Sequence, residues 1–317
     1  MTKSFFYMIG LLLTVNALSS ELYRYQDSNG RWVFGDKQSI YDRSKIIPDN
    51  AEKIIIIDER KLHSQPAIQV KQGGDSQNNE SWVLKNPLPV MVQHWLALRV
   101  KGQERVIKSV IANPHENIVL KAEDFTADVL KNAVNFTDLK FKHYYILGKP
   151  IAVPKQYQLP LPYGKNKRFR ISQGFKGKYS HSGRGNRYAV DIAMPVGEPV
   201  RVVKAGVVAD GRDDFSIGGA ANYFLDKANH VTVMHDDGTY GIYAHILYGS
   251  MAVEIGERVL PGQVLARIGN TGYSTGPHLH FVLRYNSGKG AYSIPFKFRT
   301  KEGSREPKQG DYYSGTL

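Results

Sequence analysis

From Leu159 onward the sequence consists of short strand-like runs separated by glycines, and this spacing limits the fold more than any other feature. The runs are rich in Val, Ile and Tyr, which favour strands. The intervals between them are too short for the helices that connect parallel strands. The sequence therefore predicts a mostly antiparallel sheet. The runs cover residues 188–193, 199–204, 207–210, 230–235, 241–246, 263–268 and 278–284.

The segment 269–281 leads into the last of these runs and carries two histidines at positions i and i+2. Its glycines and Pro277 predict a tight loop, after which the chain becomes apolar. Side chains alternate between the two faces of a strand, so His278 and His280 should point the same way. Two imidazoles on one face can share a metal ion, or one can be a ligand and the other a base. A surface strand with two incidental histidines is the alternative.

Asp191 is the only charged residue in the apolar run 188–193. A buried carboxylate is costly unless it is paired or binds a metal. Pairing with Arg187 or with a backbone donor is one explanation. The other is a Zn²⁺ ion held by His181, Asp191 and His280, because three protein ligands and one open position are typical of catalytic zinc.

Two of the remaining histidines are candidates for catalysis. His278 and His245 are candidates for proton transfer or for stabilising an oxyanion, since imidazole changes charge near neutral pH. Five further histidines show no ligand spacing and receive no role in the prediction. They are His94, His115, His143, His230 and His235.

The first residues predict export. Lys3 precedes an apolar run over residues 5–18, and residues 17–19 form an acceptable cleavage site for a signal peptide. The run is shorter than the roughly 20 residues that span a bilayer, although an uncleaved N-terminal anchor is an alternative. No later stretch is apolar enough for a membrane span, so we expect none after signal cleavage.

The absence of cysteine excludes disulfides and an N-terminal lipid-modified cysteine. Any metal must then be held by histidine and carboxylate, and an exported chain of this kind suits a bacterial envelope. The chain has 42 Lys and Arg against 29 Asp and Glu, a formal charge of +13. Export makes nucleic acid an unexpected partner, whereas an anionic envelope polymer fits the charge. A basic surface that serves solubility is the alternative.

Composition also predicts how the chain is divided. Asn29 and Gly30 lie between two aromatic runs, a strong signal for a β-hairpin, and residues 54–57 should add a strand. Residues 122–134 offer a single helix as an alternative to strands. The expected units are a signal peptide (1–19), a small hairpin domain (20–63), a linker (64–80), a β-sandwich-like domain (81–156), a glycine-rich β domain (157–297) and an extended or disordered polar tail (298–317).

Many motifs in the glycine-rich domain resemble, in the same order, those of the lysostaphin/LytM-type zinc metallopeptidases. The resemblance covers about two fifths of the chain. A weaker resemblance links the hairpin domain to a small envelope domain of unknown function. The matching pieces of the metallopeptidase family are Gln173-Gly174, Ser180-His181-Ser182-Gly183, residues 186–191, 194–200, 206–208, 228–231 and 235–238, Tyr243-Ala244-His245, Gly262-Gln263 and residues 269–281.

This resemblance implies an all-β chain whose C-terminal domain is an antiparallel β metallopeptidase of the duplicated hybrid motif type. It implies that His181, Asp191 and His280 bind one Zn²⁺ per chain and that His245 and His278 form the catalytic pair. Nine residues separate His181 from Asp191, a longer loop than in the shortest family members. Glycines in this loop make it flexible enough to bring both residues to one metal.

The activity implied is a zinc-dependent endopeptidase that hydrolyses crosslinks or stem peptides of bacterial cell-wall peptidoglycan. The protein would act in the periplasm or cell envelope, or be secreted. The main alternative is a non-catalytic envelope factor that binds peptidoglycan or activates cell-wall amidases. Such relatives lack one or more of the five site residues, and this chain has all five. A structural or carbohydrate-binding protein is a third reading, and a regulatory envelope partner could act through the upstream domains.

Overall fold

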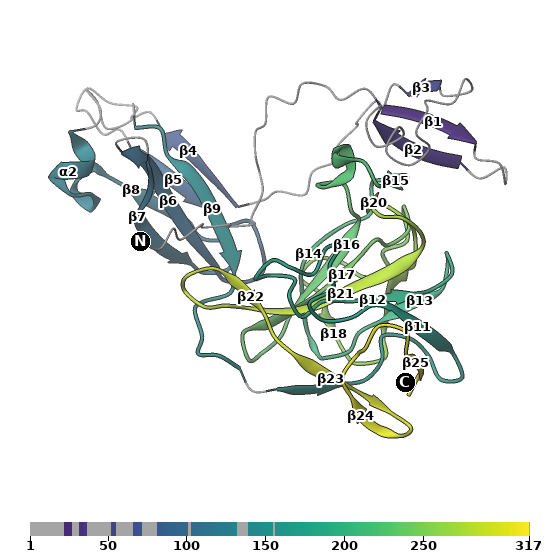
Figure 1. Ribbon diagram of the computed structural model, residues 1–317. Helices are drawn as coiled ribbons and strands as arrows, with labels where there is room; N and C mark the ends of the chain where they lie inside the picture. Colours follow the sequence, from purple (N-terminus) through teal and green to yellow (C-terminus); the bar gives the residue numbers. More distant parts are fainter. Residues whose placement is uncertain are drawn as a thin grey trace, which may run out of the picture.

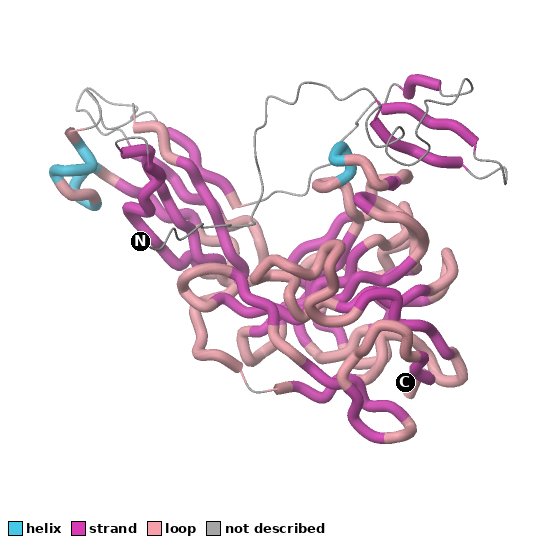
Figure 2. Tube along the Cα trace, in the orientation of Figure 1, coloured by secondary structure: helices cyan, strands magenta, loops and turns pink. Residues whose placement is uncertain are grey.

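The computed structural model describes residues 22–26, 32–36, 52–54, 66–71, 81–100, 103–131, 139–154 and 156–316. Over these residues the chain is nearly all β, as the sequence predicted (Figure 1, Figure 2). The predicted signal peptide lies outside them. No helix in the described part of the chain has the length and apolarity needed to cross a membrane.

The predicted hairpin is present near the start of the chain. Strand β1 (Leu22–Gln26) pairs antiparallel with β2 (Trp32–Asp36), so that Gln26 lies opposite Trp32. A third strand, β3 (Glu52–Ile54), pairs with β1. This strand begins two residues earlier than the predicted run 54–57, whose last three residues lie outside the described ranges.

The next unit contains two three-stranded antiparallel sheets. Buried Leu84, Leu96 and Leu120 pack between them, an arrangement that matches the predicted sandwich. One sheet has the order β4 (Ala67–Lys71), β5 (Ser81–Lys85), β8 (Asn117–Leu120). The other has the order β7 (Gln103–Ala112), β6 (Val92–Val100), β9 (Lys142–Leu147).

The structure differs from two expectations for this unit. The expected linker 64–80 contains strand β4, which pairs with β5 along its whole length. Its residues Ile68 and Val70 favour strands, a signal that the polar residues around them obscured. The alternative of a single helix from residue 122 is not seen in its described part. Residues 122–131 hold only the short 3₁₀ turn η1 (Ala122–Asp124) and the four-residue helix α2 (Ala127–Leu130).

The C-terminal half is organised on one large sheet, in which every neighbouring pair is antiparallel. This confirms the predicted topology. The order is β18 (Arg258–Val259), β14 (Gly206–Arg212), β16 (His230–Met234), β17 (Thr239–Ala244), β21 (His278–Asn286), β12 (Val190–Ala193), β11 (Arg168–Gln173) and β25 (Tyr312–Ser314), with β22 (Ala291–Ser293) paired to β21.

Smaller sheets complete the domain. They are β13 (Pro199–Arg201) with β19 (Val264–Arg267), β15 (Gly218–Gly219) with β20 (Gly272–Tyr273), and β10 (Tyr157–Leu159) with β23 (Phe296–Thr300) and β24 (Gly303–Arg305). The short 3₁₀ helix η3 (Asn222–Phe224) lies between β15 and β16.

Alternation along the central strands separates the core from the candidate site. Ile192, Leu279 and Phe281 are fully buried and pack in the main hydrophobic core. Their neighbours Asp191 and His280 point to the opposite face, because successive side chains on a strand alternate. The sheet therefore presents polar groups on the face that does not pack on this core.

The predicted polar tail from residue 298 is extended in part and is not disordered in the described residues. It continues β23, forms β24, and adds β25 to the edge of the large sheet beside β11. Tyr313 is the reason: its ring is buried in the main core, its hydroxyl donates to the Glu306 carbonyl, and its own carbonyl accepts from Tyr163. Two aromatic side chains thus fix a segment whose composition is otherwise polar.

Candidate metal centre

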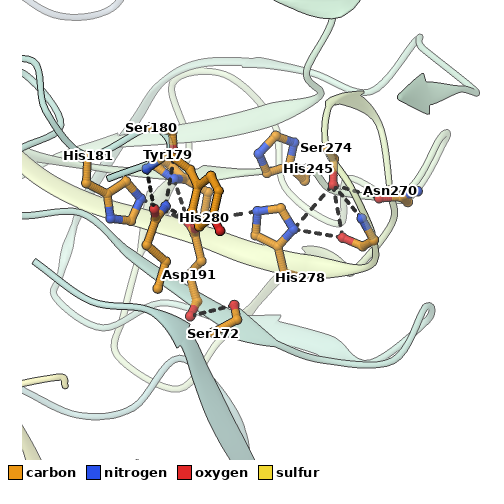
Figure 3. A network of polar contacts seen from close by, with 12 residues as sticks. Ser172, Tyr179, Ser180, His181, Asp191, His245, Asn270, Ser274, His278 and His280 are labelled. Atoms are coloured by element: carbon orange, nitrogen blue, oxygen red, sulfur yellow. Dashed lines mark hydrogen bonds and ion pairs between the residues drawn. The ribbon is translucent and has the colours of Figure 1, made fainter. Parts of the chain in front are cut away.

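Two of the predicted ligands are brought together by strand register. Strands β12 and β21 pair antiparallel, and Asp191 lies directly opposite His280. Side chains opposite each other in such a pair share one face, and His280 Nδ1 lies 2.8 Å from Asp191 Oδ1. His278 is two residues earlier on β21, so its ring lies on the same face (Figure 3).

The third predicted ligand comes from the loop before β12. His181 is fully buried; its Nδ1 lies 2.9 Å from the Gly174 carbonyl and its Nε2 3.2 Å from Asp191 Oδ1. One donor atom each from His181, Asp191 and His280 lies within 4.8 Å of the other two. In the described ranges this is the one group of three such side chains with metal-binding spacing.

The long loop between His181 and Asp191 is held along β21 and β22. Arg284 donates from Nε to the Gly185 carbonyl at 2.6 Å and from Nη2 to the Asn186 side chain. Ser293 donates from its backbone and its hydroxyl to the Arg184 carbonyl. The loop is therefore anchored at several points, and its length does not separate the two residues at its ends.

The donor chemistry of the group fits a divalent cation. The Gly174 carbonyl can only accept, so Nδ1 of His181 carries a hydrogen, and in the neutral imidazole Nε2 presents a lone pair to Asp191 Oδ1. Two lone pairs at 3.2 Å repel unless a cation or a proton lies between them. One carboxylate and two imidazoles are a common zinc ligand set, and the backbone bond to Nδ1 fixes the tautomer as in many metal sites.

Electrostatics keep the carboxylate charged. Burial raises the pKa of Asp191, but hydrogen bonds with His181 and His280 and the charges of neighbouring histidines outweigh it and hold the pKa well below its ordinary value. Burial lowers the pKa of His280, against the opposing effect of Asp191. An ionised carboxylate is the form of Asp191 that metal binding requires.

The two predicted catalytic histidines lie beside this group. The ring centroids of His245 and His278 are 4.5 Å apart, and His278 Nε2 is 3.8 Å from Asp191 Oδ1. Nδ1 of His278 lies 2.8 Å from the Gly276 carbonyl, and Nδ1 of His245 lies 2.6 Å from the Thr271 carbonyl. Both Nδ1 atoms therefore donate to backbone oxygens, which leaves both Nε2 atoms free to accept a proton.

His245 owes its position to an unusual backbone conformation. Strand β17 ends at Ala244, and His245 then adopts a φ of +65°. Few residues with a side chain adopt this left-handed region, and such strain is frequent at functional sites. Burial, reinforced by the charges of His278 and His280, lowers the pKa of His245 to about 3. His245 is thus neutral at physiological pH.

The five histidines without a predicted role lie away from this group. His230 contacts Asp210 at 3.2 Å, and His235 contacts the Ala205 carbonyl at 2.9 Å. His94 and His143, which share no spacing in the sequence, meet in the sandwich unit with ring nitrogens 2.8 Å apart. His115 lies in the loop between β7 and β8. None of the five joins the group around Asp191.

Sequence reasoning missed the residues that support the site. Thr271 and Gly276 bond the catalytic candidates through their carbonyls, which any residue type possesses, so no side-chain signal could reveal them. Ser274 lies 3.3 Å from His278 Nδ1 (Figure 3). Gln173 donates to Asp191 Oδ2 at 2.8 Å. Its place in the motif Gln173-Gly174 was visible in the sequence, but nothing there indicated what it contacts.

Comparison with known proteins finds similarity in the part of the chain that carries this site. Residues 185–291 match the sequence model of Peptidase family M23, a span that includes Asp191, His245, His278 and His280 and begins just after His181. The region is 38% identical over 104 residues to glycyl-glycine endopeptidase ALE-1 of Staphylococcus capitis, covering 32% of this chain and 26% of that protein. It is 31% identical over 120 residues to peptidoglycan DD-endopeptidase ShyC of Vibrio cholerae, covering 37% and 25%.

The similarity is thus confined to about a quarter of the length of these curated relatives. Among solved structures, the catalytic domain of lysostaphin from Staphylococcus simulans is 25% identical, with 44% of this chain and 88% of that chain covered and a TM-score of 0.28.

Proposed function

Because residues 185–291 form a peptidase family M23 domain, we propose that the chain is a zinc-dependent endopeptidase that hydrolyses peptide bonds in bacterial cell-wall peptidoglycan. The observation that carries the proposal is the convergence of donor atoms from His181, Asp191 and His280 within 4.8 Å, with two further histidines beside them. The relatives ALE-1 and ShyC are both named as endopeptidases, which supports peptide-bond hydrolysis.

In this proposal His181, Asp191 and His280 hold one zinc ion per chain. When bound, zinc supplies a Lewis acid that polarises a substrate carbonyl and makes water more acidic. Asp191 contributes negative charge to the site, and its hydrogen-bonded environment keeps it ionised. The buried position of His181 limits its motion, so the donor atoms are arranged before substrate arrives.

His245 and His278 handle protons beside the metal ligands. Each directs its Nδ1 hydrogen to a backbone carbonyl, so each presents Nε2 as an acceptor. An acceptor can take a proton from water as it attacks the peptide carbonyl and return it to the leaving amine. Once protonated, the same nitrogen becomes a donor that can stabilise the oxyanion. Proton transfer is therefore the main role proposed for both residues, and oxyanion stabilisation is the second.

The setting of the activity also belongs to the proposal. We place the protein in the periplasm or cell envelope, or outside the cell, on the basis of the predicted signal peptide at residues 1–19. The formal charge of +13 suits an anionic wall polymer as substrate. The hairpin and sandwich units then position the substrate or mediate control by an envelope partner.

The test is to express residues 20–317 and incubate the protein with purified peptidoglycan, with and without chelator and with added zinc. Separation of the muropeptides should show new amino termini that disappear with chelator and in Asp191→Ala. Loss of zinc without loss of cleavage would refute a zinc mechanism. One zinc per chain without cleavage would favour control by a partner, and neither zinc nor cleavage would favour the amidase activator or binding protein.

A further inference from the structure

Gln173 lies beside the proposed metal ligands. It forms hydrogen bonds with Asp191 on β12 and with the loop that precedes His181. Gln173 is the last residue of β11 and lies opposite Asp191. The pairing shifts register between Ile171 and Gln173, and such irregularities redirect side chains. Gln173, Asp191 and His280 consequently form one row across β11, β12 and β21.

Each polar group of the Gln173 amide has a partner in this row or in the loop before His181. Its Nε2 donates to Asp191 Oδ2 at 2.8 Å and to Ser180 Oγ at 2.9 Å, and its Oε1 accepts from the Tyr179 backbone N–H at 3.1 Å. A backbone N–H can only donate and an ionised carboxylate can only accept, so the orientation of the amide is fixed by its partners.

The contact with Asp191 decides which carboxylate oxygen is available. Oδ2 is occupied by Gln173, while Oδ1 faces His181 Nε2 and His280 Nδ1. The bonds to Tyr179 and Ser180 hold the two residues immediately before His181 (Figure 3). A single buried amide thus orients one ligand and restrains the loop that carries another.

The surrounding chain leaves room for this amide. A Cβ atom placed on Gly177 would lie 2.3 Å from Gln173 Cγ and 2.7 Å from its Oε1. A side chain at position 177 would therefore displace the Gln173 amide. The side chain is only 6% exposed, so water does not compete freely for its hydrogen bonds.

We propose that Gln173 is a positioning residue that sets the metal affinity of the site by fixing Asp191 and the loop before His181. The inference rests on the proposed zinc site. Outer hydrogen-bond partners of metal ligands commonly change metal affinity 10–100-fold when they are replaced. We expect a loss in that range when the amide is removed.

The test compares zinc affinities of the full chain and its variants by competition with a chelator of known affinity. Gln173→Met keeps the length of the side chain but removes its hydrogen bonds. Ser172→Ala is the matched control, because Ser172 bonds the backbone carbonyl of Asp191 at 3.1 Å and not its carboxylate. Gly177→Ala displaces the amide without altering it, and serves if Gln173→Met folds poorly.

We expect Gln173→Met and Gly177→Ala to weaken zinc binding roughly 10–100-fold and to change the visible spectrum of the Co²⁺-substituted chain. Ser172→Ala should keep the affinity within about 2-fold, because it leaves the carboxylate contacts intact. A purely structural role predicts lower unfolding midpoints in chelator with unchanged zinc affinity, and that result would overturn the inference. If the wild-type chain bound no zinc, the proposed function would be wrong. If wild type and both variants bound zinc with the same affinity, the inference alone would be wrong.

Discussion

The described part of the protein contains two groups of close histidines, and only one of them includes a carboxylate. In the sandwich unit, His94 and His143 lie with ring nitrogens 2.8 Å apart and stacked rings. In the C-terminal domain, His181 and His280 both face the Asp191 carboxylate. In the described part of the chain, only the second group has three side chains with metal-binding spacing.

The carboxylate changes what the imidazoles can do. One nitrogen of the His94–His143 pair can donate to the other, so the contact is satisfied within the pair. Around Asp191, His181 Nε2 and His280 Nδ1 both face Oδ1 of one carboxylate, so an anionic donor lies between two imidazoles. Proximity of two histidines therefore does not by itself make a metal site; the Asp191 carboxylate supplies the third donor that the His94–His143 pair lacks in the described part of the chain.

The largest effect that separates the two groups should be on catalysis. We expect His278→Ala to reduce the rate of peptidoglycan hydrolysis by about 10²–10⁴-fold, the usual contribution of a proton-transfer residue, while zinc binding persists. His143→Ala should leave the rate unchanged. Release of amino termini measures the rate, and metal analysis measures zinc per chain. An equal loss of activity in both variants would end the distinction between the groups.

Zinc should stabilise one group and not the other. Zinc at 100 times its dissociation constant should increase the free energy of unfolding of the full chain by about 2.7 kcal/mol, if it binds only the folded state. Asp191→Asn should abolish this gain and His94→Gln should preserve it. Thermal unfolding with and without zinc provides the measurement. Protection that survives in Asp191→Asn would show that the carboxylate is not a ligand.

The smallest expected effect is a loss of folding stability in mild acid. Burial lowers the pKa of His94 and of His143 to about 4, with a further contribution from His143 to His94. Histidines with lowered pKa stabilise the fold above their ordinary value of about 6.5, and this stability is lost as the pH falls toward 4. From pH 7.5 to pH 6 the pair should cost about 1–2 kcal/mol.

The stabilising contribution of the Asp191 carboxylate should be lost in a different pH range from that of His94 and His143. Asp191 has a lowered pKa, so its stabilising contribution persists down to its ordinary value and disappears only in stronger acid. Urea unfolding at pH 7.5 and pH 6 should therefore show a smaller loss in the variant His94→Gln/His143→Gln than in wild type. The double variant retains His235 and His245, whose pKa values are also lowered, so part of the loss in stability should remain in it. Equal losses in both proteins would disprove the role of the pair.

The sequence predicted much of the candidate site because the relevant signals are local. Spacing of two residues on a strand placed His278 and His280 on one face, and an isolated charge in an apolar run drew attention to Asp191. Gln173 was missed because its contact with Asp191 depends on a register shift in β11. A shift of this kind leaves no pattern in the residue types.

Long-range pairing also explains the other differences. His94 and His143 are 49 residues apart and meet only because β6 pairs with β9. Residues 303–314 look polar along the sequence, and their order depends on the burial of Tyr313 against strands formed more than a hundred residues earlier. The antiparallel class was predictable from loop lengths, whereas partners across the sheet were not.

The pairing of β11 with β25 has a consequence for the order in which the protein assembles. The Ile171 backbone exchanges hydrogen bonds with Gly310 and Asp311, and a Cβ on Gly174, whose carbonyl holds His181, would lie 2.8 Å from the Pro307 carbonyl. The strand that leads to the first ligand is thus completed by residues made some 140 positions later. Contacts of such separation form slowly. The ligand set of the proposed site would then be complete only when these last strands had docked, so metal uptake would report the end of folding.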